Sequence, residues 1–328
     1  EAEQLRGLEL LREGHGLGDP ICSFELAQAL GERGEVQALQ EALAVTAAAA
    51  ATGDADCALL NVALRIDAKQ RPAVTDRAWL AYLHQALAAD LPAAPGRLAQ
   101  LIERGWLHRD RAGELRIGPA LTGVDWRAAF RLRLASAEAG EVWQQREVGR
   151  KLLHGEDGAP TDASAGLLWL RRAADAGDPI AQHLLAQQLL HGRHLPRDSG
   201  QARLLLALAI EDDLPEARRD RAIADLLGLG EVWGSAEDAL QALAECVEQE
   251  EDPIACEALA AAHLQGVGVA RNPAEAMRWL RRGVRMEGPG LWMWFHYACR
   301  CAPWPIRLIG QGLVRLGLQP RPLSLRFE

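Results

Sequence analysis

A short string of residues returns along the chain at multiples of one period. Asp178-Pro179-Ile180-Ala181 is repeated at Asp252-Pro253-Ile254-Ala255, 74 residues later, which is twice 37. Leu152-Leu153-His154-Gly155 returns after 37 residues at Leu189-Leu190-His191-Gly192. A fixed period of about 20–50 residues is the sequence signature of stacked repeat proteins. The period therefore constrains the fold more than any single motif, and it predicts a chain that stacks one small unit many times.

Each unit is expected to be a pair of antiparallel helices. Asp before Pro favours a helix start, because Asp caps the free N–H groups and Pro suits the first turn. Ala and Leu, both strong helix formers, dominate the composition, and aromatic residues make up 5%. The helices after Glu141 are expected at 143–153, 163–175, 180–190, 199–211, 217–227, 236–248, 254–264 and 273–286. The predicted fold class is therefore all-α, an α-solenoid of stacked antiparallel helix pairs over residues 1–290.

Two earlier stretches extend the repeat pattern with less regularity. Asp19-Pro20-Ile21-Cys22 and Asp54 to Cys57 open two units 35 residues apart. Residues 67–140 are expected to hold divergent repeats with an inserted loop at 106–124, where glycines interrupt the helical periodicity. Within that loop, Leu115 to Ile117 is expected to be a short extended piece.

The C-terminal segment, residues 291–328, differs from the repeats in composition. Trp292 and Trp294 lie in an aromatic run, and the stretch from Arg278 to Glu328 holds nine Arg against two Glu. A solenoid needs an end that covers its last apolar face. We expect a cap and tail here, with contact to a partner or to a membrane surface as the alternative.

The repeat also resembles a known family. Gly266-Val267-Gly268-Val269, then Trp279 to Arg282 and Gly283, are similar to the Sel1-like repeat, a relative of the tetratricopeptide repeat. The resemblance is good over 141–287, fair over 1–66 and poor between 67 and 140. It implies a right-handed superhelix in which the first helix of each pair lines a concave surface. It also implies a bacterial protein, since bacterial members are often secreted, periplasmic or envelope-associated.

The function expected from this resemblance is a non-catalytic scaffold that binds another protein on its concave face. An envelope adaptor and an immunity protein for a secreted toxin both fit. The exposed positions between the joints are the candidate partner-binding residues, together with the aromatic run: His183, Gln187, Glu257, Trp292 and Trp294. The alternative is a cysteine-rich Sel1-type enzyme acting on β-lactam or peptidoglycan-like substrates, although the sequence has no Ser-x-x-Lys pattern.

No motif for catalysis, metal binding or cofactor binding stands out. The sequence lacks H-E-x-x-H, G-x-S-x-G and the phosphate-binding P-loop. His183, His191 and His194 lie close in sequence, but no Cys or carboxylate joins them with metal-ligand spacing. A net charge of −9 argues against a general nucleic-acid binder. No run reaches the roughly 18–20 apolar residues that span a bilayer, so any envelope association would be peripheral.

The cysteines leave one covalent question open. Cys246 and Cys256 flank the turn between two expected helices, so they form either a disulfide or two buried thiols. The resemblance points to a cysteine-rich branch that bridges its helix pairs; Cys256 matches that branch, whereas Cys246 lies about two residues early. The chain starts at Glu1 without Met, which fits removal of a leader. A periplasmic or secreted location is expected, with a cytoplasmic one as the alternative.

Overall fold

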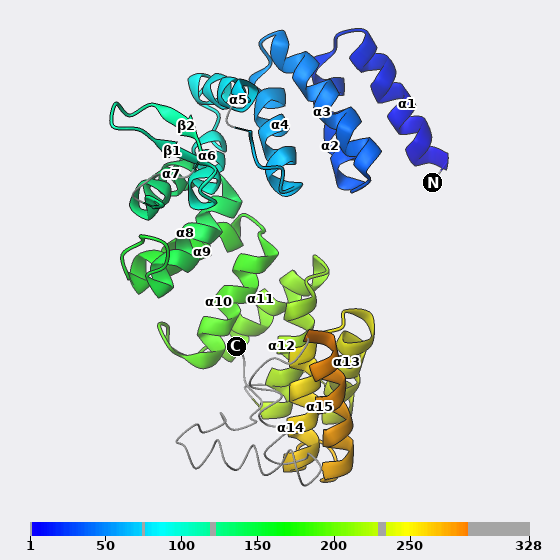
Figure 1. Cartoon of the computed structure of the whole chain (residues 1–328). Coiled ribbons are helices and arrows are strands. Elements are labelled where there is room, and N and C mark those ends of the chain that lie inside the picture. The colour runs from blue at the N-terminus through cyan, green and yellow to red at the C-terminus, as the bar shows by residue number, and fades with distance from the viewer. Residues whose placement is uncertain (1, 74–75, 119–122, 229–233, 288–328) are drawn as a thin grey trace, which may run out of the picture. The chain divides into compact units, whose positions relative to one another are not determined.

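The structure, a computed structural model, describes residues 2–73, 76–118, 123–228 and 234–287 (Figure 1). Over these residues the chain forms fifteen helices and two three-residue strands, which confirms the all-α prediction. Within each part of the chain, neighbouring helices pack against one another in the sequential order of an α-solenoid. The chain divides into two compact units, one ending at Trp169 and the other beginning at Leu170.

The first unit contains the more varied elements. Its helices are α1 (Ala2–Gly16), α2 (Pro20–Glu32), α3 (Val36–Ala51), α4 (Ala55–Asp67), α5 (Arg77–Ala88), α6 (Ala94–Glu103), α7 (Trp126–Glu138) and α8 (Val142–His154). Its strands are β1 (Leu107–Arg109) and β2 (Leu115–Ile117), and α9 (Ala163–Asp175) crosses the boundary between the units.

The second unit is the regular part of the repeat. Its helices are α10 (Pro179–His191), α11 (Ser199–Glu211), α12 (Pro215–Leu227), α13 (Ala236–Gln249), α14 (Pro253–Gln265) and α15 (Pro273–Glu287). All eight helices expected after Glu141 form, and each begins and ends within two residues of its predicted bounds. The even-numbered helices are the first helices of their pairs.

The repeated string is the joint at which a new pair begins. Asp178 Oδ1 accepts a hydrogen bond from Ala181 N at 2.7 Å, and Asp252 Oδ1 accepts one from Ile254 N at the same distance. Each of these Asp residues is the N-cap of a helix that starts at proline. The helix then ends at a left-handed glycine, for example Gly192 at φ 65°. The string is therefore structural, as the sequence indicated.

Small side chains allow the stacked helices to approach one another. Ala181, Ala186, Ala255 and Ala260 are completely buried. In the Trp-Leu-Arg-Arg motif of α9, Trp169 and Leu170 are buried while the two arginines that follow are exposed. Burial of apolar area along these seams is what holds a solenoid together, since each pair contacts mainly its neighbours.

The divergent middle keeps the helix pairs but adds a β-hairpin. The strands pair antiparallel with Leu107 opposite Ile117, so the extended piece predicted at 115–117 is confirmed. Buried Trp79 of α5 meets Trp106 edge to face, with ring centroids 6.3 Å apart. These contacts fix the hairpin beside α5 and α6 in one core. The predicted inserted loop at 106–124 is therefore largely a packed hairpin over its described residues.

Candidate functional site

The first helices of the second unit carry two of the predicted partner-binding residues, but in a different setting from the one expected. His183 and Gln187 lie one turn apart on α10 and are only 7% and 9% exposed. The prediction that they are exposed is therefore wrong. The reason is that α10 packs against neighbours on more than one side, so eight of its thirteen residues are buried.

Both side chains bind a buried carboxylate on the next first helix. His183 Nε2 lies 2.7 Å from Asp220 Oδ2 of α12, and Gln187 Nε2 donates to the same oxygen at 2.8 Å. Arg219 Nε donates to the other carboxylate oxygen at 2.9 Å, and its Nη1 reaches Asp252 Oδ2 at 3.0 Å. This set of five residues, the Asp220 network, joins α10, α12 and the N-cap of α14.

The network fixes the charge states of its buried members. Burial alone would raise the pKa of Asp220, but the hydrogen bonds from His183 and Gln187 and the charge of Arg219 hold it below its usual value. Burial would likewise lower the pKa of Arg219, and the charges of Asp220 and Asp252 raise it instead. A carboxylate held charged by hydrogen bonds and an adjacent cation is unsuited to take up a proton at neutral pH. The Asp220 network is therefore a structural link between neighbouring repeats.

The other predicted residues divide into two groups. Glu257 on α14 is half-buried, so it remains a candidate contact on a first helix. Trp292 and Trp294, like the whole expected cap at 291–328, lie outside the described residues.

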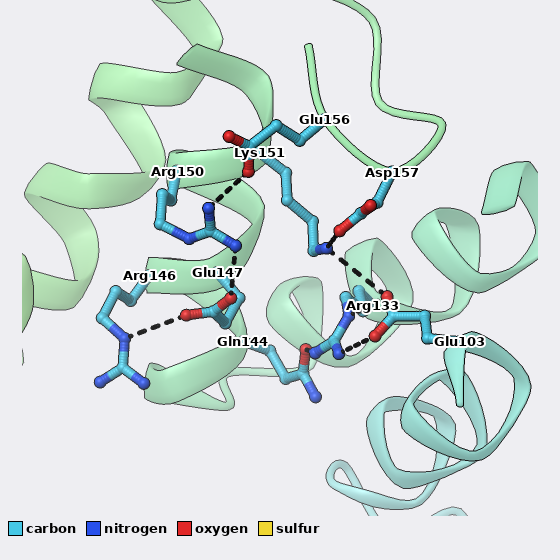
Figure 2. Close-up of polar contacts among 9 residues, drawn as sticks. All are labelled: Glu103, Arg133, Gln144, Arg146, Glu147, Arg150, Lys151, Glu156 and Asp157. Atoms are coloured by element: carbon cyan, nitrogen blue, oxygen red, sulfur yellow. Dashed lines mark hydrogen bonds and ion pairs between the residues drawn. The ribbon is translucent and has the colours of Figure 1, made fainter. Parts of the chain in front are cut away.

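A second buried network lies in the first unit (Figure 2). The Arg133 side chain of α7 reaches Glu103 of α6 through two bonds, Nε to Oε1 at 2.7 Å and Nη2 to Oε2 at 2.5 Å. Its Nη1 donates to Gln144 Oε1 of α8 at 3.0 Å, and Lys151 of α8 pairs with both Glu103 and Asp157. Arg133, Gln144 and Lys151 are all at most 5% exposed. The fork-like Arg–carboxylate pair thus ties three successive helices together.

Figure 2 also shows a shallower chain of charges along α8. Glu147 lies within ion-pairing distance of Arg146 and Arg150, and Arg150 Nη1 reaches Glu156 Oε2 at 2.5 Å. These side chains are partly exposed, and such pairs stabilise by only about 0–1 kcal/mol. The deep part of the network, not this chain, is the one that determines helix packing.

The first helices of this unit also border a pocket. Its volume is about 630 Å³, and we call it the α2–α4–α6 groove. It is lined by residues of α2, α4 and α6, and also by residues of α3 and of the α2–α3 connection. The lining residues are Gln28, Gly31, Glu32, Gly34, Leu39, Leu60, Ala63, Leu64, Asp67, Ala68 and Arg97. The walls are largely aliphatic, with Arg97 as the one cation among the lining residues. A concave, mainly apolar site with a few polar groups is the usual form of a binding pocket.

A shallower pocket of about 760 Å³ lies between α5 and the β-hairpin. Arg77, His84, Arg109 and Arg116 line it together with Glu114 and aliphatic residues. Arg116 already pairs with Asp110 at 2.9 Å, and the Arg109 guanidinium donates to the Gly113 carbonyl. Part of the positive charge that lines this pocket is therefore already bonded within the β-hairpin.

The described cysteines are free thiols. Cys246 and Cys256 are buried and unbridged, so of the two alternatives the structure contains the pair of ordinary thiols and not the disulfide. Burial raises the pKa of Cys246 to about 12 and that of Cys256 to about 11. Within the described ranges, no three His, Cys, Asp or Glu side chains gather as a metal site would require. None of the described helices has the length and apolar character to cross a bilayer.

Comparison with known proteins agrees with this architecture. The Sel1 repeat family matches residues 145–178, 179–214 and 253–286, which correspond to the pairs α8–α9, α10–α11 and α14–α15. No curated protein matches the chain. The fold is similar to the crystal structure of a Sel1 repeat protein from Oxalobacter formigenes, with a TM-score of 0.55 and 19% identity over 95% of this chain and 88% of that one.

A second solved structure has the same fold. It is c5321, a protective antigen present in uropathogenic Escherichia coli strains and displaying an SLR fold, with a TM-score of 0.63 and 18% identity. The match covers 94% of this chain but 62% of that one, so this chain spans less than two thirds of its length. Residues 145–214 and 253–286 of this chain are therefore Sel1 repeats, and the fold of the chain is similar to that of the two solved Sel1-like proteins.

Proposed function

We propose that this chain is a non-catalytic scaffold that binds a partner protein along its first helices. The observation that supports this most directly is the α2–α4–α6 groove, which the first helices of three successive pairs line together. Because Sel1 repeats are typically protein-interaction scaffolds, such a groove between repeats is the natural place for a partner segment.

The buried polar groups support a scaffold and not an enzyme. Asp220 and Glu103 are each held by basic side chains, and these pairs join helices. A thiol nucleophile needs a lowered pKa, whereas burial raises the pKa of Cys57 to about 12. The alternative activity, hydrolysis of β-lactam-like substrates, is tested by nitrocefin turnover with purified protein. Hydrolysis above the background rate would contradict the scaffold proposal.

The groove can be closed without disturbing the core. Ala68 is exposed at the C-cap of α4 and lines the groove, so Ala68→Trp would fill it. Ala89 is exposed at the equivalent C-cap of α5 and does not line it, which makes Ala89→Trp a matched control. We expect both variants to fold and only Ala68→Trp to lose partners captured from native extract, identified by mass spectrometry. Equal capture by both variants would contradict the groove as the binding site.

The nature of the partner is a finer proposal. An envelope adaptor would capture a resident envelope protein, whereas an immunity protein would capture a secreted toxin and protect cells from it. An envelope adaptor would lie in the periplasm or outside the cell, whereas an immunity protein would lie wherever its toxin acts, which includes the cytoplasm. Fractionation of the native source tests the location, and recovery in the cytoplasmic fraction alone would contradict the adaptor role.

A further inference from the structure

Arg97 of α6 differs from the other buried or half-buried arginines of the first unit. It stacks over the ring of Trp143, with its guanidinium carbon 5.5 Å from the ring centroid, and its Nη1 donates to Gln100 Oε1 at 3.1 Å. Among the described residues no carboxylate lies within ion-pairing distance of it, and its Nε and Nη2 have no hydrogen-bond acceptor. The guanidinium is therefore held in position by Trp143 and Gln100, while its Nε and Nη2 donors remain accessible to solvent.

Arg133 provides the comparison within the same network. It stacks on the Trp143 ring at 5.4 Å, but both arms of its fork are taken by Glu103. Burial lowers the pKa of Arg97, and the nearby charges of Arg133 and Arg104 add to this effect. The charges of Asp67 and Glu141 oppose this lowering of the pKa, but neither carboxylate forms an ion pair with Arg97. Partial burial of the Arg97 charge without a paired carboxylate costs free energy, and an anion beside Arg97 would offset that cost. Arg133 already has Glu103 as its anion.

The surroundings of Arg97 indicate which anion would fit. The α2–α4–α6 groove that it lines has aliphatic walls, including Leu39, Leu60 and Leu64. Asp67 and Glu32 also line it and would repel a second negative charge. A single planar carboxylate can accept two parallel hydrogen bonds from a guanidinium and carries one negative charge. A phosphate group carries up to two negative charges, so Asp67 and Glu32 would repel it more strongly.

We propose that the α2–α4–α6 groove binds a carboxylate carried by an apolar peptide segment of the partner, with Arg97 as its counter-ion. This inference rests on the proposed scaffold function and names the chemistry of the segment that it binds. The carboxylate comes from either a chain terminus or an acidic side chain, since both present the same group to Arg97.

Three synthetic peptides separate these sources. Acetyl-Ala-Leu-Leu with a free terminus offers a terminal carboxylate, acetyl-Leu-Glu-Leu-amide offers a side-chain carboxylate, and acetyl-Ala-Leu-Leu-amide offers none. Titration calorimetry with the full chain is expected to show binding of at least one carboxylate peptide, at least about tenfold tighter than the amide. That binding should weaken as salt is raised, because partly exposed charges are screened.

Two substitutions and a control assign the effect to the groove. Arg97→Met keeps the aliphatic stem over Trp143 and removes the fork, so it should abolish the preference for the carboxylate. Asp67→Asn removes a repulsive charge and should tighten binding. Arg127→Met is the matched control, because Arg127 is exposed and does not line the groove.

The outcomes distinguish this inference from the scaffold function. Equal affinity for the amide, no binding of either carboxylate peptide, or an unchanged preference in Arg97→Met would overturn the role of Arg97. If Arg97→Met proved too unstable to measure, Asp67→Asn would serve as the test: tighter binding of the carboxylate peptides would support the role of Arg97, and unchanged or weaker binding would overturn it. Loss of partner capture in Ala68→Trp would still support the scaffold function in any of these cases.

Discussion

At the scale of single residues, the chain uses buried ion pairs where a solenoid of this kind could have used apolar contacts alone. Asp220 is 1% exposed, yet it is charged because it accepts bonds from three side chains on α10 and α12. Breaking a buried pair is more costly than making it is favourable, because the partner is left as an uncompensated charge. The Asp220 network therefore specifies how neighbouring repeats align.

Asp220→Asn tests this role. The substitution removes the carboxylate that His183, Gln187 and Arg219 share and leaves Arg219 paired with Asp252 alone, so we expect the free energy of unfolding at pH 7 to fall by about 3 kcal/mol. Urea titration followed by circular dichroism measures it. Asp212→Asn, at an exposed carboxylate in the same unit, is the control and should change stability little. A loss no larger than that of the control would show that the network does not hold α10 and α12 together.

The same residue predicts a dependence on pH. The pKa of Asp220 is lower in the folded protein than its unfolded value of about 3.9, so its stabilising contribution is fully present above that value. It is lost as the pH falls below 3.9 through the folded pKa. The difference in stability between wild type and Asp220→Asn should therefore shrink in that acidic window, measured by urea titration at each pH. A difference that stayed constant from neutral pH to pH 2 would contradict the assignment.

Cys246 and Cys256 give a further prediction, because their pKa values are raised and the folded protein keeps both thiols neutral. The raised pKa values of Cys246 and Cys256 mean that almost no thiolate forms at pH 8 while the protein is folded. We expect iodoacetamide to label both cysteines only after unfolding, and a reducing agent to leave the melting temperature unchanged. Peptide mass spectrometry of protein handled without reductant is the check. A peptide joining Cys246 to Cys256 through a disulfide would contradict it.

At the scale of the elements, glycines set the distance between loops and helices. Gly158 has φ 80°, and a Cβ there would lie 2.6 Å from the backbone carbon of Trp126 at the start of α7. Gly113 at the hairpin tip has φ 84°, but a Cβ there would meet nothing within 4 Å. The two positions carry similar backbone strain and differ in packing.

Alanine at these two glycines separates strain from contact. Gly113→Ala should cost about 1–2 kcal/mol for the left-handed backbone alone. Gly158→Ala should cost a further 1–3 kcal/mol or so, because the loop must move away from α7. Thermal unfolding of the two variants side by side measures the difference. Equal losses would mean that the 155–162 loop adjusts freely and does not pack against α7.

The elements were also the part that the sequence predicted best. Each Asp-Pro joint and each terminal glycine acts within one helix, so the bounds of the eight regular helices follow from local chemistry. The sequence predicts the start of α12 two residues late, because Leu214 stands where α10 and α14 have Asp178 and Asp252. The exposure of His183 was not predictable in this way, because it depends on Asp220 of the next repeat. One signal was present: His183 and Asp220 are separated by 37 residues, one period.

The candidate site shows the same limit. Arg97 lies on α6, in the part of the chain where the repeat pattern is weakest, whereas the leucines of the groove come from α3 and α4. A period fixes which residues are equivalent only where the repeats match, and residues 67–140 hardly do. The groove therefore emerges from packing between helices and not from any motif that a single stretch carries.

At the scale of the whole molecule, stability in a solenoid is close to a sum of terms for each repeat and each contact between neighbours. A cavity made in one pair should therefore loosen that pair and the next, and leave distant pairs as they were. Leu280 of α15 and Leu83 of α5 are both completely buried, and they lie in different compact units. They form a matched pair of sites for this test.

Leu280→Ala and Leu83→Ala should each cost about 2–5 kcal/mol locally, as large-to-small core changes do. Hydrogen exchange with mass spectrometry reads where that cost falls. We expect Leu280→Ala to speed amide exchange in α14 and α15 while α4 to α6 keep their wild-type rates, and Leu83→Ala to give the reverse pattern. Because the α2–α4–α6 groove lies with Leu83, only Leu83→Ala should also weaken the carboxylate peptides. If both variants sped exchange across all fifteen helices, the chain would unfold as one cooperative body, and a partner bound at the groove would stabilise every repeat at once.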